Sequence, residues 1–189
     1  MLYSVSYRGA CAAARHESCV IVAYPDGEFA DGRIRYANGY GDNDPKWKAG
    51  DKTTPEEAWA AYLENLRERD KDLDRWIDSE ILQHQYDALA SAYYQAGSKI
   101  RGVIGLIDAG DEREAMALLA TFNRKKDPKT KAMVFSRGLH QRRTMEINLY
   151  MKGDYADMVA DTLKPAKLKF WEGDPNTTPF REVDFPPET

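Results

Sequence analysis

The chain has 189 residues, of which 42% are hydrophobic and 31% are charged, a balance typical of a folded domain rather than of a disordered chain. Its length fits one domain, because single cores commonly span about 100 to 200 residues. A net charge of -4 without a block of Lys and Arg excludes the basic footprint of a nucleic-acid-binding protein. The apolar run CVIVAY is far shorter than the roughly 20 residues that cross a bilayer, and the first nine residues lack a signal-peptide core.

The N-terminal part predicts a short helix followed by a β-hairpin. Residues 7–18 are rich in alanine and favour a helix, whereas CVIVAY and GRIRYANGYG are β-branched and aromatic segments separated by PDGEFADG. We expect turn chemistry at Pro25, Gly27 and Gly32, and we expect the hairpin to end at Gly39 and Gly41, where the backbone must bend.

From Thr54 the apolar pattern becomes helical. Thr54 is placed to cap a long helix, Pro55 suits its first position, and Glu57 completes a capping box. An apolar stripe at three- and four-residue steps predicts one buried face, whereas RERDKD is expected to face solvent. The stripe comprises Trp59, Tyr62, Leu63, Leu66, Leu73, Trp76 and Ile77.

Further helices are predicted in QHQYDALASAYYQAG, ending at Gly97, and in IRGVIGLIDAG, ending at Gly110. The first is expected to be a buried central helix. Asp111 with Glu114 predicts another capped helix through EAMALLATF. NRKKDPKTK reads as a loop before a last helix that ends at Gly153. The face expected to be buried on the central helix comprises Tyr86, Leu89, Ala90 and Tyr93.

The pattern predicts an α+β fold, mostly α, in which a small N-terminal hairpin sheet precedes a helical lobe of about six helices. Residues 1–162 form the predicted domain. Residues 163–189 lose all periodicity and predict an irregular extension rich in Pro, Asp and Thr. Cys11 and Cys19 are interpreted as reduced, partly buried thiols, and the three scattered histidines offer no metal-ligand spacing.

The order of motifs resembles the phage lysozymes, or endolysins, of glycoside hydrolase family 24. The segments that carry the likeness are HESCVIVAYPD, ANGYG, TTPEEAW, HQYDALASAYYQAG and RGLHQRRTMEINLY, spread over about residues 8 to 155. The resemblance implies a lysozyme-like fold and a muramidase that cleaves the β-1,4 bond between N-acetylmuramic acid and N-acetylglucosamine.

On this resemblance Glu17 matches the general acid and Asp26 the second catalytic carboxylate. Such a pair protonates the leaving oxygen and activates water on the opposite face of the sugar. By residue type alone, Glu17 also fits a plain helix-end carboxylate, and YPDG fits an ordinary turn.

The resemblance also places Tyr40, Asn43, Tyr94 and Gln95 along the substrate cleft, since aromatic and amide groups suit sugar rings and N-acetyl groups. The tyrosines fit a core equally well. Arg142 and Arg143 are better explained as structural salt bridges than as substrate contacts. The family implies no cofactor and no metal.

Ala37 departs from the family pattern, which has a threonine there that positions the attacking water. Alanine cannot form a side-chain hydrogen bond, and the adjacent Asn38 would point to the other face of a strand. Milder departures are Ser18, Gln95 and Phe122. Two alternatives therefore stay open: a lytic transglycosylase, and a non-catalytic peptidoglycan-binding or virion structural protein with this fold.

For an endolysin we expect a monomer whose partner is the peptidoglycan glycan strand, without stable membrane insertion. The lack of a signal peptide predicts that it accumulates in the host cytoplasm and reaches the periplasm and cell wall through a lesion made by a separate membrane-permeabilising protein.

Overall fold

The computed structural model describes residues 3–127, 129–155 and 167–184. The chain divides into two compact units, each built from segments distant in sequence. The sheet unit comprises residues 11–65 and 159–189, and the helical unit comprises residues 1–10 and 66–158. No helix within the described ranges is both long and apolar enough to span a membrane.

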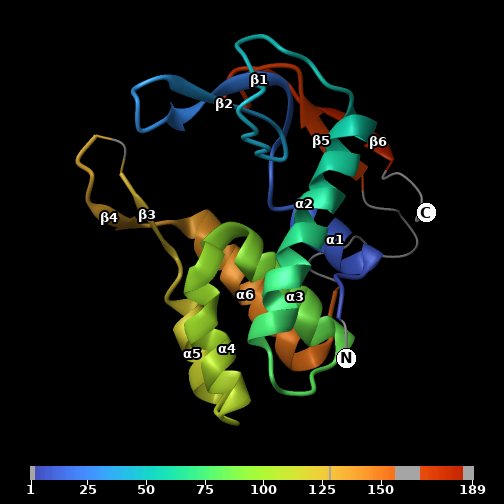
Figure 1. Ribbon diagram of the computed structural model, residues 1–189, viewed down its shortest axis with the longest axis vertical. Helices are drawn as coiled ribbons and strands as arrows, with labels where there is room; N and C mark the ends of the chain where they lie inside the picture. Colours follow the sequence, from blue (N-terminus) through green and yellow to red (C-terminus); the bar gives the residue numbers. More distant parts are fainter. Residues whose placement is uncertain (1–2, 128, 156–166, 185–189) are drawn as a thin grey trace. The chain divides into compact units, whose positions relative to one another are not determined.

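The sheet unit contains a four-stranded sheet in the order β2-β1-β5-β6 (Figure 1). Its strands are β1 (Cys19–Glu28), β2 (Ile34–Gly39), β5 (Lys167–Trp171) and β6 (Arg181–Asp184). β1 pairs antiparallel with β2 and parallel with β5, and β6 runs antiparallel to β5. The central strand β1 therefore joins the predicted hairpin to the C-terminal segment.

The predicted hairpin is confirmed, but its turn lies later than expected. β1 continues through Pro25, whose Cα pairs with Tyr36, and the chain reverses where the Phe29 amide donates to the Arg33 carbonyl at 2.8 Å. Gly32 lies in this turn, whereas Gly27 lies in β1 at a register shift with φ of 92°. The turn role expected for Pro25 and Gly27 is wrong, because an irregular strand accommodates both residues.

Gly39 ends the hairpin as predicted, and the reason is close packing as well as backbone conformation. Its φ is 57°, and a Cβ at this position would lie 3.0 Å from the Ala58 Cβ on the next helix. Gly41 follows with a φ of 83°. A side chain at Gly39 would therefore be strained and would also push against α2.

The irregular extension predicted for residues 163–189 is wrong for the strands β5 and β6. The Cα partners Cys19↔Phe170 and Val20↔Trp171 join β5 to β1, and Phe170 is 6% exposed. Helical periodicity cannot detect such short strands, and Pro and Thr in the connecting loop conceal their alternation. Residues 163–166 and 185–189 of the predicted extension lie outside the described residues.

Two helices, α1 and α2, contribute residues to the sheet unit. α1 (Tyr7–Ala14) ends four residues before the predicted limit, and residues 15–17 form a turn. α2 (Pro55–Trp76) begins as predicted, with reciprocal bonds from the Thr54 amide to Glu57 and from the Glu57 amide to the Thr54 hydroxyl. Its first turns place Trp59 and Tyr62 in the core at 3% and 2% exposure.

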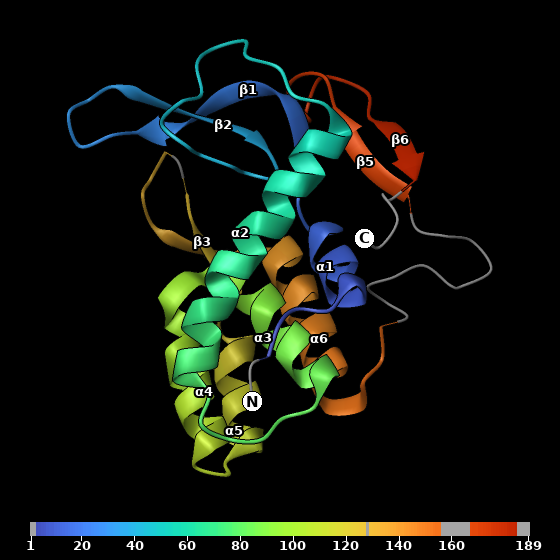
Figure 2. The same cartoon turned by 45° about the vertical axis from the view of Figure 1, so that its right-hand side comes forward.

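The helical unit contains α3 (Gln83–Ala96), η1 (Gly97–Lys99), α4 (Ile100–Asp108), α5 (Glu112–Ala120) and α6 (Arg137–Lys152) (Figure 2). α3 packs along α6, and α4 pairs with α5. The prediction of a buried central helix is confirmed for α3, although Tyr93 is only half-buried and Asp87 and Ser91 are fully buried instead.

Buried carboxylates tie the N-terminal residues to the helical unit. Asp87 accepts from the Ser6 amide at 2.8 Å, the Ser6 hydroxyl at 2.6 Å and the Tyr155 hydroxyl. Asp70 accepts from the Val5 amide and the Tyr86 hydroxyl and is 7% exposed. The expectation that RERDKD faces solvent is therefore wrong at Asp70, because its partners satisfy the buried charge.

Two local predictions in the helical unit also need correction. The loop NRKKDPKTK contains β3 (Arg124–Lys126), which pairs with β4 (Met133–Phe135) as a short antiparallel hairpin. Its strands are mostly exposed, so the sequence contains no alternation of apolar and polar residues that would predict them. Asp111 precedes α5 at the cap position but makes no side-chain cap bond.

The structural role predicted for Arg142 and Arg143 is confirmed. The Glu146 carboxylate, which is 0% exposed, lies 3.0 Å from Arg142 Nε and 2.8 Å from Arg143 Nε. The Ser91 hydroxyl on α3 donates to the same carboxylate at 2.7 Å, and Arg142 donates to the Ser91 carbonyl at 2.9 Å. The network thus joins α6 to α3.

Candidate active site

Glu17 lies between α1 and β1. The α1 helix ends at Ala14, and the Glu17 amide then donates to the Ala14 carbonyl at 3.0 Å, which closes a tight turn. Two residues later, buried Cys19 begins β1. The half-buried Glu17 is thus held between a buried helix and the central strand of the sheet, on a short segment with little freedom.

Asp26 lies on β1 and pairs with Arg35 of the neighbouring strand β2. The Arg35 guanidinium donates to the Asp26 carbonyl at 2.9 Å and lies 3.4 Å from the carboxylate. The Asp26 side chain is 46% exposed, so its carboxylate is also open to water. Arg35 therefore binds both the main chain and the carboxylate of Asp26, while the carboxylate stays partly open to water.

Tyr24 connects the two predicted catalytic residues. Burial raises the pKa of its hydroxyl, and the charges of Asp26 and Glu17 raise the pKa further. Both carboxylates therefore lie within electrostatic reach of one phenol in the sheet unit. Tyr24 stays protonated at neutral pH and can donate a hydrogen bond. Sequence reasoning did not single it out, although its position two residues before Asp26 on a strand is a usable signal.

Cys19 and Tyr40 form a buried pair behind this segment. Cys11 and Cys19 are both buried and form no disulfide, in agreement with the prediction of reduced thiols. Burial raises the pKa of Cys19 to about 12, and a hydrogen bond with Tyr40 partly offsets this increase. Burial also raises the pKa of the Tyr40 hydroxyl. Neither group ionises near neutral pH, so the pair is structural.

Tyr40 was predicted to contact substrate, but it belongs to an aromatic core. It is 5% exposed, and its ring centroid lies 4.8 Å from that of Tyr62 and 6.1 Å from that of Trp59. This burial favours the core interpretation of Tyr40. Asn43, predicted for the same role, is exposed in the loop after β2.

The Ala37 side chain is fully buried, and the side chain of the adjacent Asn38 forms hydrogen bonds with the backbone. The Asn38 amide oxygen accepts from the Gly39 amide at 2.6 Å, and its nitrogen lies 3.4 Å from the Asp51 carbonyl. With both ends of its side chain engaged and 1% exposure, Asn38 is poorly suited to hold the attacking water in place of threonine.

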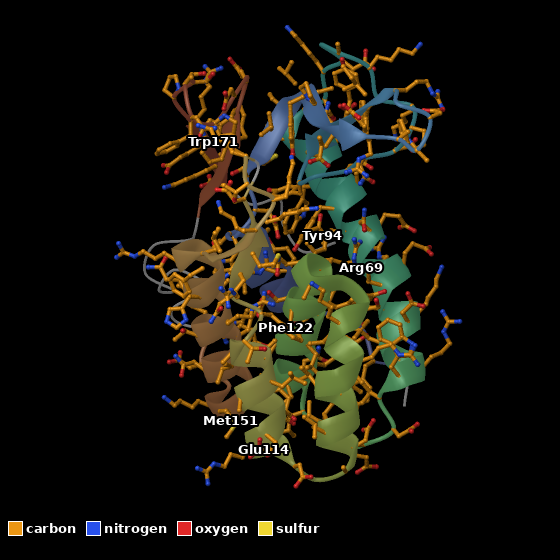
Figure 3. The ribbon with its side chains drawn as sticks, turned by 90° about the vertical axis from the view of Figure 1, so that its left-hand side faces the viewer. Arg69, Tyr94, Glu114, Phe122, Met151 and Trp171 are labelled. Atoms are coloured by element: carbon orange, nitrogen blue, oxygen red, sulfur yellow. The ribbon has the colours of Figure 1, made fainter. Side chains whose placement is uncertain are left out.

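Tyr94 and Gln95, the other two predicted substrate-binding residues, lie near the end of α3 in the helical unit. The Arg69 guanidinium lies 4.6 Å from the centroid of the Tyr94 ring (Figure 3). Gln95 is exposed and lines a cavity of about 250 Å³ together with Ala96, Lys99, Thr121, Phe122, Arg124 and Met133. Gln95 is thus available to a ligand, whereas Arg69 covers part of Tyr94.

The carboxylates and histidines form no metal centre in the described part of the chain, where no three His, Cys, Asp or Glu residues are grouped to hold an ion. The chemistry available at Glu17 and Asp26 is that of two carboxyl groups and a neighbouring phenol. Such groups transfer protons and stabilise positive charge, as glycoside hydrolysis requires.

Solved structures of phage endolysins and a muramidase domain have the same fold. An endolysin from Escherichia coli O157:H7 phage FAHEc1 matches with a TM-score of 0.69 and 26% identity, covering 81% of this chain and 96% of that chain. The muramidase domain of SpmX from Asticaccaulis excentricus matches with a TM-score of 0.68 and 22% identity, covering 79% of this chain and 99% of that chain. The predicted lysozyme-like α+β fold is confirmed.

A P22 lysozyme mutant also matches, with a TM-score of 0.61 and 20% identity over 79% of this chain and 99% of that chain. No curated protein matches the sequence. The family model described as phage lysozyme matches residues 14–146, which include Glu17, Asp26 and the α6 ion-pair network. The chain therefore belongs to the phage lysozyme family.

Proposed function

We propose that this lysozyme cleaves the β-1,4 bond between N-acetylmuramic acid and N-acetylglucosamine, with Glu17 as general acid and Asp26 as general base. Membership of the family makes the chain a peptidoglycan hydrolase. The observation that carries the residue assignment is the placement of Glu17 in the turn two residues before β1 and of Asp26 on β1, both within the residues that match the family model. It supports a single site in the sheet unit in which both carboxylates act on one substrate.

In the proposed reaction the Glu17 carboxyl group donates its proton to the glycosidic oxygen as the bond from that oxygen to the anomeric carbon breaks. Asp26 accepts a proton from a water molecule, whose oxygen bonds to the anomeric carbon from the opposite face. The configuration at that carbon is inverted, as in glycosidases whose carboxyl groups leave room for a water. The exposure of the Asp26 side chain, 46%, supports access of that water.

The side chain at Ala37 cannot orient the water, and the Asn38 amide is engaged by the backbone. Tyr24 is the better candidate for this task, because it lies on β1 two residues before Asp26 and burial keeps its hydroxyl protonated. A hydroxyl can donate one hydrogen bond and accept another, so it can hold a water against a carboxylate.

The decisive experiment is mass spectrometry of the muropeptides released from purified peptidoglycan. Reducing muramic acid ends are expected from the parent protein, and Glu17→Gln and Asp26→Asn should each lower the rate roughly 10²- to 10⁴-fold, the usual contribution of a general acid or base. Glu28→Gln is the matched control, since Glu28 is an exposed acid on the same strand. Anhydro ends would identify a transglycosylase, and no release from folded protein would favour a binding or structural role.

We further propose that the enzyme acts as a monomer in phage-mediated lysis and needs a separate membrane-permeabilising protein to reach the wall. The endolysin from phage FAHEc1 supports the lytic role. Expression in bacteria should leave growth unchanged until the membrane is permeabilised, after which the culture should lyse. Lysis without permeabilisation would overturn the release mechanism. Analytical sedimentation of the purified protein tests whether it is a monomer.

A further inference from the structure

The β5–β6 hairpin lies outside residues 14–146, which carry the family match, and it adds two strands to the sheet. Side chains along each strand alternate between the two faces. Phe170 is buried at 6% exposure, so its neighbours Lys169 and Trp171 lie on the opposite face of the hairpin. We call this opposite face, formed by Lys169, Trp171, Phe180 and Glu182, the outer face.

The outer face presents two aromatic rings at one end of the hairpin (Trp171 is labelled in Figure 3). The ring centroids of Trp171 and Phe180 lie 5.9 Å apart at 59°, and Phe180 is 46% exposed. If β5 and β6 served only to extend the sheet, the side chains on the solvent-facing side of these strands would be expected to be polar. The aromatic pair therefore calls for an explanation beyond packing.

The charges around the aromatic pair are balanced. Lys169 Nζ lies 4.0 Å from Glu182 and 4.4 Å from the Phe180 ring centroid. The cation that this face presents thus lies opposite a carboxylate of the same hairpin. A surface of this kind offers little attraction to a polyanion, whereas flat aromatic rings suit the apolar faces of sugar rings.

The loop between the strands supplies polar groups beside the rings. Asp174 organises it, accepting from the amides of Asn176, Thr177 and Thr178. Asn176 and Thr177 are exposed in this loop. The Asn176 side-chain nitrogen donates to the Asp174 carboxylate at 2.9 Å, which orients the amide so that its oxygen can accept from a ligand. Sugar recognition combines such hydrogen-bonding groups with aromatic stacking.

We propose that the outer face binds a glycan strand of peptidoglycan at a site separate from the catalytic carboxylates, with Trp171 and Phe180 stacking on sugar rings. The inference rests on the proposed function for the identity of the polymer. β5 pairs directly with β1, the strand that carries Asp26, so both sites belong to one sheet. The hairpin would then hold the enzyme on an insoluble wall between cleavage events.

Co-sedimentation with purified insoluble peptidoglycan at low temperature tests binding without turnover. Trp171→Ala and Phe180→Ala should each weaken binding about fivefold to tenfold, as truncation of an aromatic anchor commonly does. Trp171→Tyr should retain most of the binding. Phe135→Ala is the matched control, because Phe135 is 59% exposed on β4 in the helical unit.

Hydrolysis of a short soluble glycan separates this inference from the proposed function. Folded Trp171→Ala should cleave the short glycan at the parent rate but insoluble peptidoglycan more slowly. If the parent binds the wall through Trp171 but cleaves neither substrate, the inference stands and the proposed catalysis fails. Parental wall binding by folded Trp171→Ala, or an equal loss in Phe135→Ala, would overturn the inference.

Discussion

At the scale of single residues, Tyr24 is the group through which the two proposed catalytic carboxylates, Glu17 and Asp26, are expected to cooperate. Tyr24→Phe removes only the hydroxyl, whose pKa is raised by burial and by the charges of Asp26 and Glu17. We expect kcat to fall about tenfold or more with little change in KM, because the hydroxyl orients water rather than binding sugar.

Steady-state kinetics together with thermal unfolding of Tyr24→Phe provide the distinguishing measurement. A hydroxyl that orients the attacking water affects kcat, whereas a hydroxyl with only a structural role affects the melting temperature. Tyr36→Phe on the neighbouring strand β2 is the matched control and should keep the parental kcat. A parental kcat in folded Tyr24→Phe, or an equal loss in Tyr36→Phe, would contradict the role proposed for Tyr24.

Asp70 should make the stability of the helical unit depend on pH. Burial raises its pKa above the ordinary value of 3.8, although hydrogen bonds from Tyr86 and Val5 oppose this increase. A carboxyl group whose pKa is raised by folding stabilises the protein fully below the unfolded pKa, and this contribution is lost as pH rises through the folded pKa.

The test compares urea unfolding of the parent and Asp70→Asn across pH. The parent should lose stability relative to Asp70→Asn as pH rises from 3.8 through the raised folded value. Glu64→Gln, an exposed change on the same helix, controls for the altered net charge. A difference in unfolding free energy that stays constant over this range, or grows in favour of the parent, would contradict the assignment.

Sequence reasoning could propose Glu17 and Asp26 because HESCVIVAYPD resembles the pattern of the phage lysozyme family. It could not place Asp70 or Asp87, whose partners Val5 and Ser6 lie 65 and 81 residues away along the chain. Tyr40 illustrates a third case. The same aromatic residue suits a cleft or a core, and only its packing on Trp59 and Tyr62 favours the core.

At the scale of elements, the contact of α6 with α3 depends on the buried Glu146. Glu146→Ala would leave Arg142 and Arg143 buried without the carboxylate that lies 3.0 Å and 2.8 Å from them. Removal of one member of a buried ion pair typically costs about 3 to 5 kcal/mol of unfolding free energy. Urea unfolding should reveal a loss of this size.

Gln141→Ala provides the control for this prediction, since Gln141 is exposed on the same helix and should change the unfolding free energy by less than about 0.5 kcal/mol. The double variant Arg142→Ala/Glu146→Ala should lose less unfolding free energy than the sum of the losses in the two single variants, because the two residues share one network. Additive losses would show that the two side chains are energetically independent.

The elements that sequence reasoning predicted have strong local signals. α2 begins at a capping box, and Gly153 ends α6 with a φ of 64°. β3, β4, β5 and β6 contain only three to five residues each, too few for a reliable periodic pattern. Their formation depends on pairing with other strands. β5, for example, pairs with β1, which precedes it by more than a hundred residues.

At the scale of the whole molecule, the fold depends on a sheet assembled from both ends of the sequence. Deletion of residues 167–189 would remove the parallel partner of β1 and the buried Phe170. We expect the truncated protein to melt at a lower temperature and to lose hydrolysis, because β1 carries Asp26. Deletion of residues 185–189 keeps both strands and should preserve stability and activity. Full stability and activity after the longer deletion would exclude this dependence.

Adjacent residues of β5 should separate the two roles of the hairpin. Phe170 is 6% exposed, so Phe170→Ala should lower the unfolding free energy by about 3 to 5 kcal/mol through loss of buried surface and cavity formation. Trp171 lies on the outer face and is half-buried, so Trp171→Ala should weaken wall binding and should lower the unfolding free energy less than Phe170→Ala does. Paired measurements of unfolding and peptidoglycan binding test this contrast. Equal effects of the two substitutions on both quantities would mean that the hairpin acts only as part of the scaffold, whereas the predicted separation assigns one face to folding and the other to the glycan.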